Sequence, residues 1–199
     1  IKLPLYESHP IRATNPYGQN KIDIENILLS DPYFKSDCSV KILRYFNPIG
    51  AHPSGVIGEN PKGIPNNLMP YILKVAQRKY QKVSVFGNDY DTYDGTGVRD
   101  YIHIMDLVDG HINGLNYHTK GVSIFNLGTG KGYSVLDLIK TFESVNLVSV
   151  PFEMTARRPG DVSAVYANPS KAESVLGFKA KRTLEDMCRD AWIFAKHNS

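Results

Sequence analysis

Two residues near the amino terminus, Tyr17 and Lys21, have side chains that could transfer protons. They lie four residues apart in the stretch TNPYGQNKIDIENILL, so on a helix both would project from one face. A free tyrosine has a pKa of about 10, but a neighbouring ammonium group stabilises the phenolate and lowers this pKa. The pair could therefore exchange a proton with a substrate hydroxyl or carbonyl beside a hydride acceptor.

The elements around this pair are predicted from pattern. Thr14 or Asn15 can cap a helix of about four turns that has Pro16 in its first turn. The run SVKILRYF is rich in β-branched and aromatic residues and predicts a buried strand. Residues 47–65 contain four glycines and four prolines, which indicates a long structured loop.

Helices and strands alternate through the rest of the chain. Apolar spacing predicts helices over residues 66–79, 105–118, 134–145, 168–176 and 183–197, and strands over 83–87, 122–130 and 148–154. Thr183 can cap the last helix, and Gly177 can close the one before it. This alternation is typical of an α/β fold with parallel strand pairing.

Composition narrows the class of protein. The chain has 199 residues, enough for one substantial domain or two small lobes, and its net charge of +3 is too small to predict a nucleic-acid partner. Cys38 and Cys188 cannot form a disulfide framework, which favours the reducing cytoplasm. No apolar run approaches the ~20 residues that span a bilayer, so no membrane partner is expected.

Two further patterns do not support the sites that they suggest. His103, Asp106, Asp109 and His111 could be metal ligands, but on a helix these offsets do not converge on one face, so we predict no metal site. The stretch GTGKGYS lacks the G-x-x-x-x-G-K-[ST] spacing of a phosphate-binding loop. Neither pattern explains the Tyr/Lys pair.

Several longer motifs together resemble one known family. They are NPYGQNKIDIENIL, LRYFNPIGAHPSGVIGENPKGIPNNLMPYI, FGNDYDTYDGTGVRDYIHIMDLVDGH, FNLGTGKGYSVLDLI and RRPGDVSAVYANPSKA. These segments closely resemble the UDP-glucose (UDP-galactose) 4-epimerases, members of the extended short-chain dehydrogenase/reductase family. The resemblance covers nearly the whole chain. It implies an α/β fold composed of a remnant of a Rossmann-type parallel sheet domain and a smaller α/β lobe that binds the substrate.

The resemblance implies a reaction that uses NAD. Tyr17 would be the catalytic acid/base, and Lys21 would lower its pKa and bind the nicotinamide ribose. Tyr45 and Phe46 would lie near the nicotinamide. The sugar of a UDP-hexose would be oxidised at carbon 4 and reduced again on its other face, which interconverts UDP-glucose and UDP-galactose.

The resemblance also implies a set of substrate-binding residues. A planar guanidinium group matches phosphate oxygens, so Arg99 and Arg158 would bind the diphosphate, with Arg157 a weaker candidate. The other implied contacts with the nucleotide sugar come from Asn47, Asn67, Leu68, Ser84, Phe86 and Asp161.

One part of the family pattern is missing before Tyr17. A dinucleotide-binding domain needs a glycine-rich turn after its first strand, and only sixteen residues precede the tyrosine. We therefore expect the chain to be the C-terminal portion of an epimerase. Residues 1–48 would complete an NAD-binding Rossmann domain, and 49–199 would bind the UDP-sugar, with some strands returning to the Rossmann sheet. By itself such a chain should be poorly stable, retain no NAD and have negligible epimerase activity.

Val165 bears on substrate range. It lies four residues after Asp161, at a position where, by resemblance, a bulky tyrosine accompanies restriction to UDP-hexoses and a smaller residue accompanies use of N-acetylhexosamines. We hypothesise that the complete protein also accepts UDP-N-acetylglucosamine.

Two alternatives stay open, and the family suggests a homodimer. The chain could come from another extended short-chain epimerase or dehydratase of nucleotide sugars. It could also be a non-catalytic fragment that binds nucleotide sugars.

Overall fold

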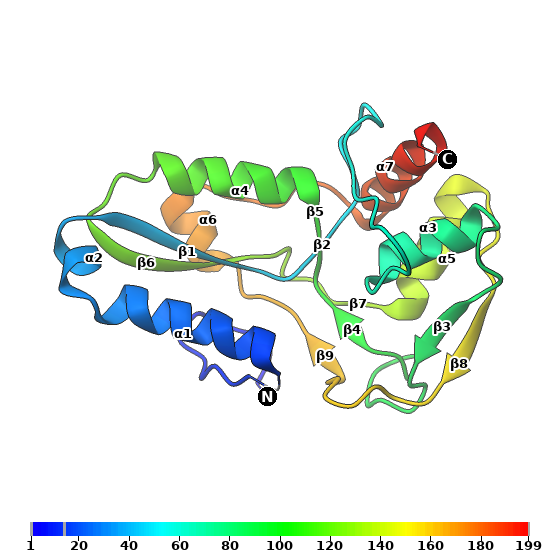
Figure 1. The fold of residues 1–199 in the computed structure, drawn as a ribbon, viewed down its shortest axis with the longest axis horizontal. Helices are drawn as coiled ribbons and strands as arrows, with labels where there is room; N and C mark the ends of the chain where they lie inside the picture. Colours follow the sequence, from blue (N-terminus) through cyan, green and yellow to red (C-terminus); the bar gives the residue numbers. More distant parts are fainter. Residues whose placement is uncertain (1, 14, 199) are drawn as a thin grey trace.

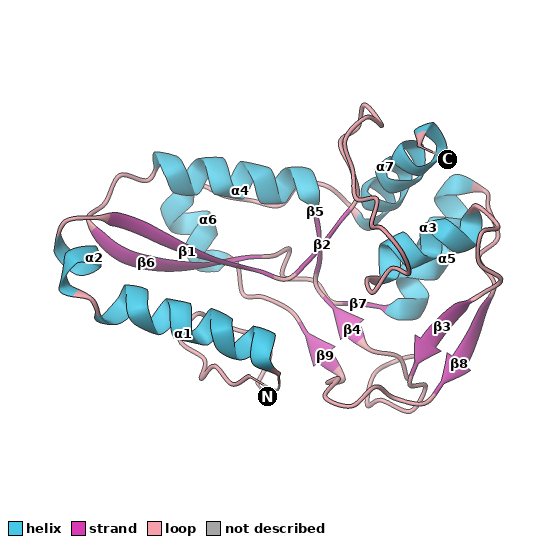
Figure 2. Cartoon of the chain, viewed as in Figure 1, coloured by secondary structure: helices cyan, strands magenta, loops and turns pink. Residues whose placement is uncertain are grey.

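The computed structural model describes residues 2–13 and 15–198 of the chain. Helices and short strands alternate along it, and the four small sheets give it the predicted α/β class (Figures 1 and 2). The helices are α1 (Pro16–Ser30), α2 (Pro32–Ser36), α3 (Leu68–Ala76), α4 (Ile104–Asn116), α5 (Val135–Asn146), α6 (Ser170–Leu176) and α7 (Leu184–His197). The strands are β1 (Ser39–Tyr45), β2 (Asn47–Ile49), β3 (Val83–Phe86), β4 (Val98–Arg99), β5 (Tyr101–His103), β6 (Gly121–Leu127), β7 (Tyr133–Ser134), β8 (Phe152–Thr155) and β9 (Ala164–Val165).

One half of the molecule is built on the long parallel pair of β1 and β6. The pairing runs from Ser39 opposite Gly121 to Tyr45 opposite Leu127. Figure 1 shows this pair between α4 and α1. A small core of buried side chains, which includes Phe125 and Phe178, joins β6 to α4 and α6.

The other half contains the larger hydrophobic core. Helices α3, α5 and α7 enclose it with β3, and its fully buried side chains include Ile72, Ile139, Phe142 and Met187. β3 pairs in parallel with β8, and β4 lies between β7 and β9. The expected parallel pairing is seen in β1–β6, β2–β5, β3–β8 and β4–β9, whereas the β4–β7 pair is antiparallel. The reason is local: Ser134 ends β7 and caps α5, so the start of the helix sets this strand.

The predicted elements match the observed ones except in burial and in the short strands. Asn15 caps α1 by accepting a hydrogen bond from the Gly18 amide, whereas Thr14 lies outside the described residues. The strand predicted as buried, β1, is half-buried, because α1 buries none of its described side chains. The expected loop 47–65 begins with β2, and the sequence patterns missed α2, β4, β5, β7 and β9, which have two to five residues each.

The proposed domain boundary at residue 48 stays a prediction. β6, from the later range, pairs with β1, from the earlier one, which is the kind of strand return that the prediction allowed. No helix in the described part of the chain is both long enough and apolar enough to cross a membrane.

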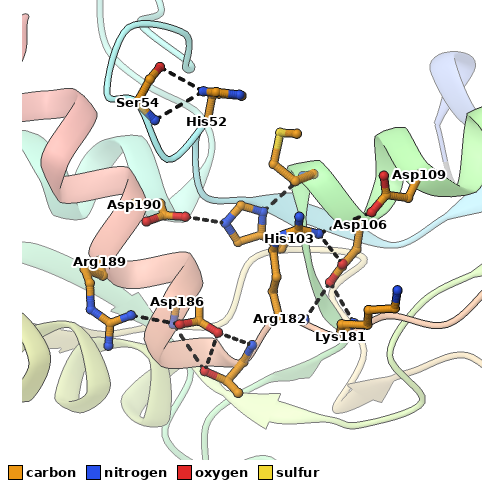
Figure 3. A network of polar contacts seen from close by, with 12 residues as sticks. His52, Ser54, His103, Asp106, Asp109, Lys181, Arg182, Asp186, Arg189 and Asp190 are labelled. Atoms are coloured by element: carbon orange, nitrogen blue, oxygen red, sulfur yellow. Dashed lines mark hydrogen bonds and ion pairs between the residues drawn. The ribbon is translucent and has the colours of Figure 1, made fainter.

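A buried histidine joins the end of β5 to α7 (Figure 3). His103 has no exposed surface, and its Nδ1 accepts a hydrogen bond from the Met105 amide at 3.0 Å. Its Nε2 lies 3.1 Å from Oδ2 of Asp190 on α7. Because Nδ1 accepts, the proton of the neutral ring is on Nε2 and is donated to Asp190. Gly50 packs against this ring, and a Cβ at that position would lie 3.0 Å from Nε2.

A second polar contact in the same region involves Asp106 of α4. Its carboxylate is buried and accepts hydrogen bonds from Nη1 of Arg182 at 2.5 Å and from the amides of Lys181 and Arg182. The segment that leads into α7 is therefore fixed to α4. His103 and Asp106 together set the position of α7 beside β5.

Protonation of His103 should destabilise the protein in mild acid. Burial lowers the pKa of His103 below its usual 6.5, so between the two values the unfolded state binds a proton that the folded state does not. The stabilisation is complete above about pH 6.5 and is lost as the pH falls toward the folded-state pKa. Between about pH 7.5 and about pH 5.5, the thermal unfolding midpoint should therefore fall more in the wild type than in His103→Gln.

The exposed His118 provides the control. His118→Gln should keep the pH dependence of the wild type. An equal acid sensitivity of the wild type and His103→Gln would contradict the prediction.

Candidate active site

A cavity of about 780 Å³ opens between α3, β3 and β4. Segments far apart in the sequence line it: Phe46 with strand β2, the start of α3, strand β3, strand β4 and the turn after β8. Nine of the residues singled out from the sequence lie on its wall: Phe46, Asn47, Asn67, Leu68, Ser84, Phe86, Arg99, Arg158 and Asp161. The fold therefore brings most of the expected substrate-binding residues to one place.

Two guanidinium groups and one carboxylate form the charged part of this wall. Arg99 donates from Nη1 to the carbonyl oxygens of Val98 and Val162, each at 2.9 Å, which fixes its direction. Its Nη2 lies 4.0 Å from Oδ1 of Asp161, and Nε of Arg158 lies 3.5 Å from Oδ2 of the same carboxylate. Within the described residues, Nε of Arg99 has no hydrogen-bond partner and Nη2 has only the 4.0 Å contact with Asp161, so both groups could bind a ligand such as a diphosphate.

Strand β3 supplies an edge and an aromatic ring. Alternate residues of a strand face opposite sides, so Val83 and Val85 are buried in the core while Ser84 and Phe86 are more exposed, and all four residues line the cavity. The guanidinium carbon of Arg158 lies 4.4 Å from the centre of the Phe86 ring, within the range of a cation–π interaction. This edge could hold a planar base.

Asn47 and Asn67, two of the asparagines that line the cavity, are held in different ways. The Asn47 amide donates to the carbonyl oxygen of Asp100 at 3.0 Å, which holds the start of β2 beside β5. Asn67 precedes α3 without capping it through its side chain, and its Nδ2 instead donates to Oε1 of Glu59 at 3.2 Å. Glu59 also lines the cavity.

Tyr17 and Lys21 lie together but outside this cavity. Both are on α1, and Nζ of Lys21 lies 5.3 Å from the centre of the Tyr17 ring. The Tyr17 side chain is 72% exposed, and neither residue is on the cavity wall. The predicted pairing of phenol and ammonium is therefore present, while its meeting with the substrate groups stays a prediction.

Glu25 and Arg44 attach the helix of this pair to β1. Nε and Nη2 of Arg44 contact the two carboxylate oxygens of Glu25 at 2.9 and 2.5 Å, and Nη1 donates to the carbonyl oxygen of Glu7. Glu25 follows Tyr17 and Lys21 at the same four-residue spacing, on the same helix face. Because α1 buries none of its described side chains, this half-buried bidentate ion pair is an important attachment.

Tyr45 and Val165 lie near the cavity without lining it. Tyr45 ends β1, is exposed, and has its ring centre 6.1 Å from that of His111. Val165 is in β9, directly opposite Arg99 of β4. Their proposed roles remain predictions.

Asp100 holds the strands around the cavity together. It has no exposed surface. Oδ1 accepts hydrogen bonds from the amide and hydroxyl of Thr129 at 2.9 and 2.6 Å, and Oδ2 accepts from the amides of Gly130 and Ala167, each at 3.1 Å. Burial raises the pKa of the Asp100 carboxyl, and these hydrogen bonds oppose the rise. Its own amide donates to the Val165 carbonyl oxygen.

Sequence reasoning missed Glu59 and Tyr90, which also line the cavity. Tyr90 is only 6% exposed, and its hydroxyl has no hydrogen-bond partner among the described residues. Glu59 is in a loop without periodicity, so no pattern marked it. Tyr90 could have been noticed as an aromatic residue in the otherwise polar run GNDYDTYDGTG. The described residues contain no group of three or more His, Cys, Asp or Glu that could hold a metal ion.

Comparison with known proteins identifies the family. Residues 2–191 match the sequence model of the family described as GDP-mannose 4,6 dehydratase, and the chain belongs to this family. The curated relatives that it matches include several UDP-glucose 4-epimerases. It is 53% identical over 197 residues to that of Bacillus subtilis (strain 168) and 51% identical over 199 residues to that of Pasteurella multocida (strain Pm70), in each case over 98% of this chain. The resemblance inferred from the motifs is confirmed.

Solved structures give the same result. The UDP-glucose 4-epimerase of Stenotrophomonas maltophila, with bound NAD and formylated UDP-arabinopyranose, has a TM-score of 0.96 and 45% identity, over 99% of this chain and 59% of that one. The enzyme of Bifidobacterium longum, in complex with NAD+ and UDP, has a TM-score of 0.91 and 47% identity, with the same coverage. The chain spans about 58% of the length of the curated relatives that it matches.

Asp100→Asn should destabilise the fold around the cavity. One of the two acceptor oxygens would become an amide N–H₂ group facing N–H donors, which leaves buried hydrogen-bonding groups unsatisfied. We expect a loss of about 2–4 kcal/mol in the free energy of unfolding, measured by urea denaturation. The exposed Asp91→Asn is the control, and equal stability of the two variants would rule out this role for Asp100.

Proposed function

We propose that the complete protein interconverts UDP-glucose and UDP-galactose through oxidation and reduction at carbon 4 of the sugar. The observation that carries the proposal is the cavity in which Arg99, Arg158 and Phe86 lie together. Two cations, an aromatic ring and a strand edge suit a diphosphate joined to a planar base. The 53% identity to a UDP-glucose 4-epimerase supports the same substrate class.

Each part of the substrate can be assigned to a part of the cavity wall. Arg99 and Arg158 would bind the diphosphate, and Ser84 to Phe86 would hold the uracil along β3. Asp161, between the two arginines, would accept a hydrogen bond from the uridine ribose. The sugar would then lie toward Phe46 and Asn47, at the end of β1, with Asn67 and Leu68 beside the sugar and diphosphate.

Tyr17 would exchange the proton of the sugar 4-hydroxyl. The ammonium group of Lys21 lies over the Tyr17 ring, and the phenol oxygen of Tyr17 would accept the proton during oxidation and return it during reduction. Arg44 and Glu25 would keep this helix face directed toward the sugar. The step requires the substrate to reach from the cavity to the first turn of α1.

The chain fits the nicotinamide end of NAD. Tyr17 and Lys21 are adjacent on an exposed helix face, and Tyr45 ends β1 with Phe46 directly after it, which would suit a ribose and a flat ring. When bound, NAD supplies the acceptor and donor of hydride for carbon 4 of the sugar. The described residues provide no glycine-rich turn between a first strand and a helix, so the pyrophosphate would be held by residues outside them.

The proposal also includes the compartment and the oligomeric state of the complete protein. The complete protein would act in the cytoplasm, consistent with Cys38 and Cys188 both being free thiols. It would form a homodimer, as the family resemblance suggests. The exposed apolar side chains of α1, which include Ile24 and Ile27, offer surface for packing against another element.

Tyr17→Phe tests the proton-transfer role. Loss of the hydroxyl should lower kcat by about 10²- to 10⁴-fold, because the ring stays while the group that carries the proton is removed. UDP affinity should not change, since Tyr17 is not on the cavity wall. The assay follows UDP-galactose formation from UDP-glucose by the complete gene product with NAD.

Tyr33→Phe, at an exposed residue of α2, is the matched control and should keep full activity. Normal turnover by Tyr17→Phe would refute the assignment. A 4-keto-6-deoxy product in place of UDP-galactose would show that the protein is a dehydratase.

Val165→Tyr tests the substrate range. The wild type should convert both UDP-glucose and UDP-N-acetylglucosamine, because the residue directly opposite Arg99 is the small Val165. The larger tyrosine should reduce kcat/KM for the N-acetyl sugar by at least about tenfold, a steric effect of the size that pocket changes produce, and leave UDP-glucose turnover largely unchanged. No turnover of the N-acetyl sugar by the wild type would remove the hypothesis.

A further inference from the structure

The two consecutive arginines of the turn after β8 have different surroundings. Arg158 lines the cavity and lies over Phe86. Arg157 is not on the cavity wall and contacts the loop that follows β3. The sequence analysis treated Arg157 as a weaker diphosphate ligand, whereas its contacts indicate another role.

Arg157 makes three contacts with this loop. Its Nε donates to Oδ1 of Asp89 at 2.7 Å, and its Nη2 donates to the carbonyl oxygen of the same residue at 2.5 Å. Its guanidinium carbon lies 4.2 Å from the centre of the Tyr90 ring, where cation–π attraction is effective. The hydrogen bond from Arg157 lowers the pKa of the Asp89 carboxyl.

The packing under these contacts is close. Gly87 has a φ of +85°, and a Cβ at this position would lie 2.4 Å from Cε2 of Tyr90 and 2.9 Å from Cγ of Arg157. Only glycine allows this approach without a shift of both side chains. Tyr90 is nearly fully buried and also lines the cavity. The ring against which the Arg157 guanidinium packs is therefore part of the cavity wall.

The backbone of the turn makes few hydrogen bonds. Before it, the Gly87 amide donates to the carbonyl oxygen of Thr155, and after it the Val98 amide donates to that of Ser163. In the described part of the chain, the backbone of residues 156–160 makes one hydrogen bond of this kind, from the Asp161 amide to the Arg158 carbonyl oxygen, within the turn. The side chain of Arg157 therefore fixes the first half of the turn.

We propose that Arg157 is a positioning residue for the nucleotide-sugar site, holding the 156–161 turn against Asp89 and Tyr90 so that Arg158 and Asp161 face the cavity. This inference rests on the proposed function, because it assigns a purpose to a turn that would bind a UDP-sugar. A turn ordered in advance loses less conformational entropy when the ligand binds. Arg157 would thus raise affinity without touching the substrate.

Calorimetric titration of the complete gene product with UDP tests the proposal. Arg157→Met should weaken UDP binding by about tenfold, and Arg157→Lys should lie between it and the wild type, because lysine keeps the charge but not the paired donors. In turnover assays KM should rise while kcat at saturation changes little, since a bound substrate orders the turn. Amide hydrogens of residues 156–162 should exchange faster in unliganded Arg157→Met.

Asp89→Ala separates this role from direct contact with UDP. It removes the carboxylate partner and leaves the guanidinium in place, so it should also weaken UDP binding severalfold. The double variant should bind UDP no more weakly than Arg157→Met alone, because both substitutions remove the same interaction between Arg157 and Asp89. Unchanged affinity in Asp89→Ala would indicate that Arg157 contacts the ligand itself and would overturn the proposal.

Arg189→Met is the matched control. Arg189 is 49% exposed, against 46% for Arg157, and also pairs with an aspartate, Asp186 of α7. The Arg189→Met variant should leave UDP affinity and the amide hydrogen exchange of residues 156–162 unchanged. Its thermal unfolding midpoint should be similar to that of Arg157→Met. If the wild type binds UDP and Arg157→Met binds it equally well, the positioning role fails alone. If the wild type binds no UDP, the proposed function fails and this inference fails with it.

Discussion

The buried carboxylate of Asp100 is the contact on which the arrangement of the cavity depends. It accepts hydrogen bonds from residues 129, 130 and 167. The backbone carbonyl of Asp100 accepts a hydrogen bond from the Asn47 amide, and its backbone amide donates one to the Val165 carbonyl oxygen. Four segments that are distant in the sequence therefore meet here: that of Asp100 itself, the start of β2, the turn at 129–130 and the stretch 165–167. Its neighbour Arg99 faces the cavity, so the position of that guanidinium follows from how firmly Asp100 is held. A buried charge is tolerated here because every hydrogen bond that it needs is supplied.

The sequence predicted the fold class and the longer elements because their patterns are local. The apolar spacing of α5 and α7, each with a capping box, marks both ends of the helix without tertiary context. Strands of two or three residues, such as β4 and β9, carry no usable period, and they exist because Asp100 and its partners bring them together. The antiparallel β4–β7 pair was missed for the same reason.

The sequence singled out residues that match a family motif and lie together on the cavity wall, whereas residues marked only by their contacts were not singled out. Arg99, Arg158 and Phe86 come from long motifs, and the fold places all three on one wall. Glu59 is marked only by its hydrogen bond to Asn67. Arg157 and Arg158 are identical in type and adjacent in sequence, so no pattern could tell which one faces the cavity. That difference appears only once Asp89, Tyr90 and Phe86 are in place.

The cavity walls and the Tyr/Lys pair are built on different elements. Strands β3 and β4, helix α3 and the turn after β8 form most of the cavity, whereas Tyr17 and Lys21 are on α1, which Glu25 and Arg44 attach to β1. Mutations in one set of elements need not disturb the other. A lineage that began with this scaffold could therefore change the shape and charge of the cavity one wall residue at a time, while the Tyr17/Lys21 pair was inherited intact.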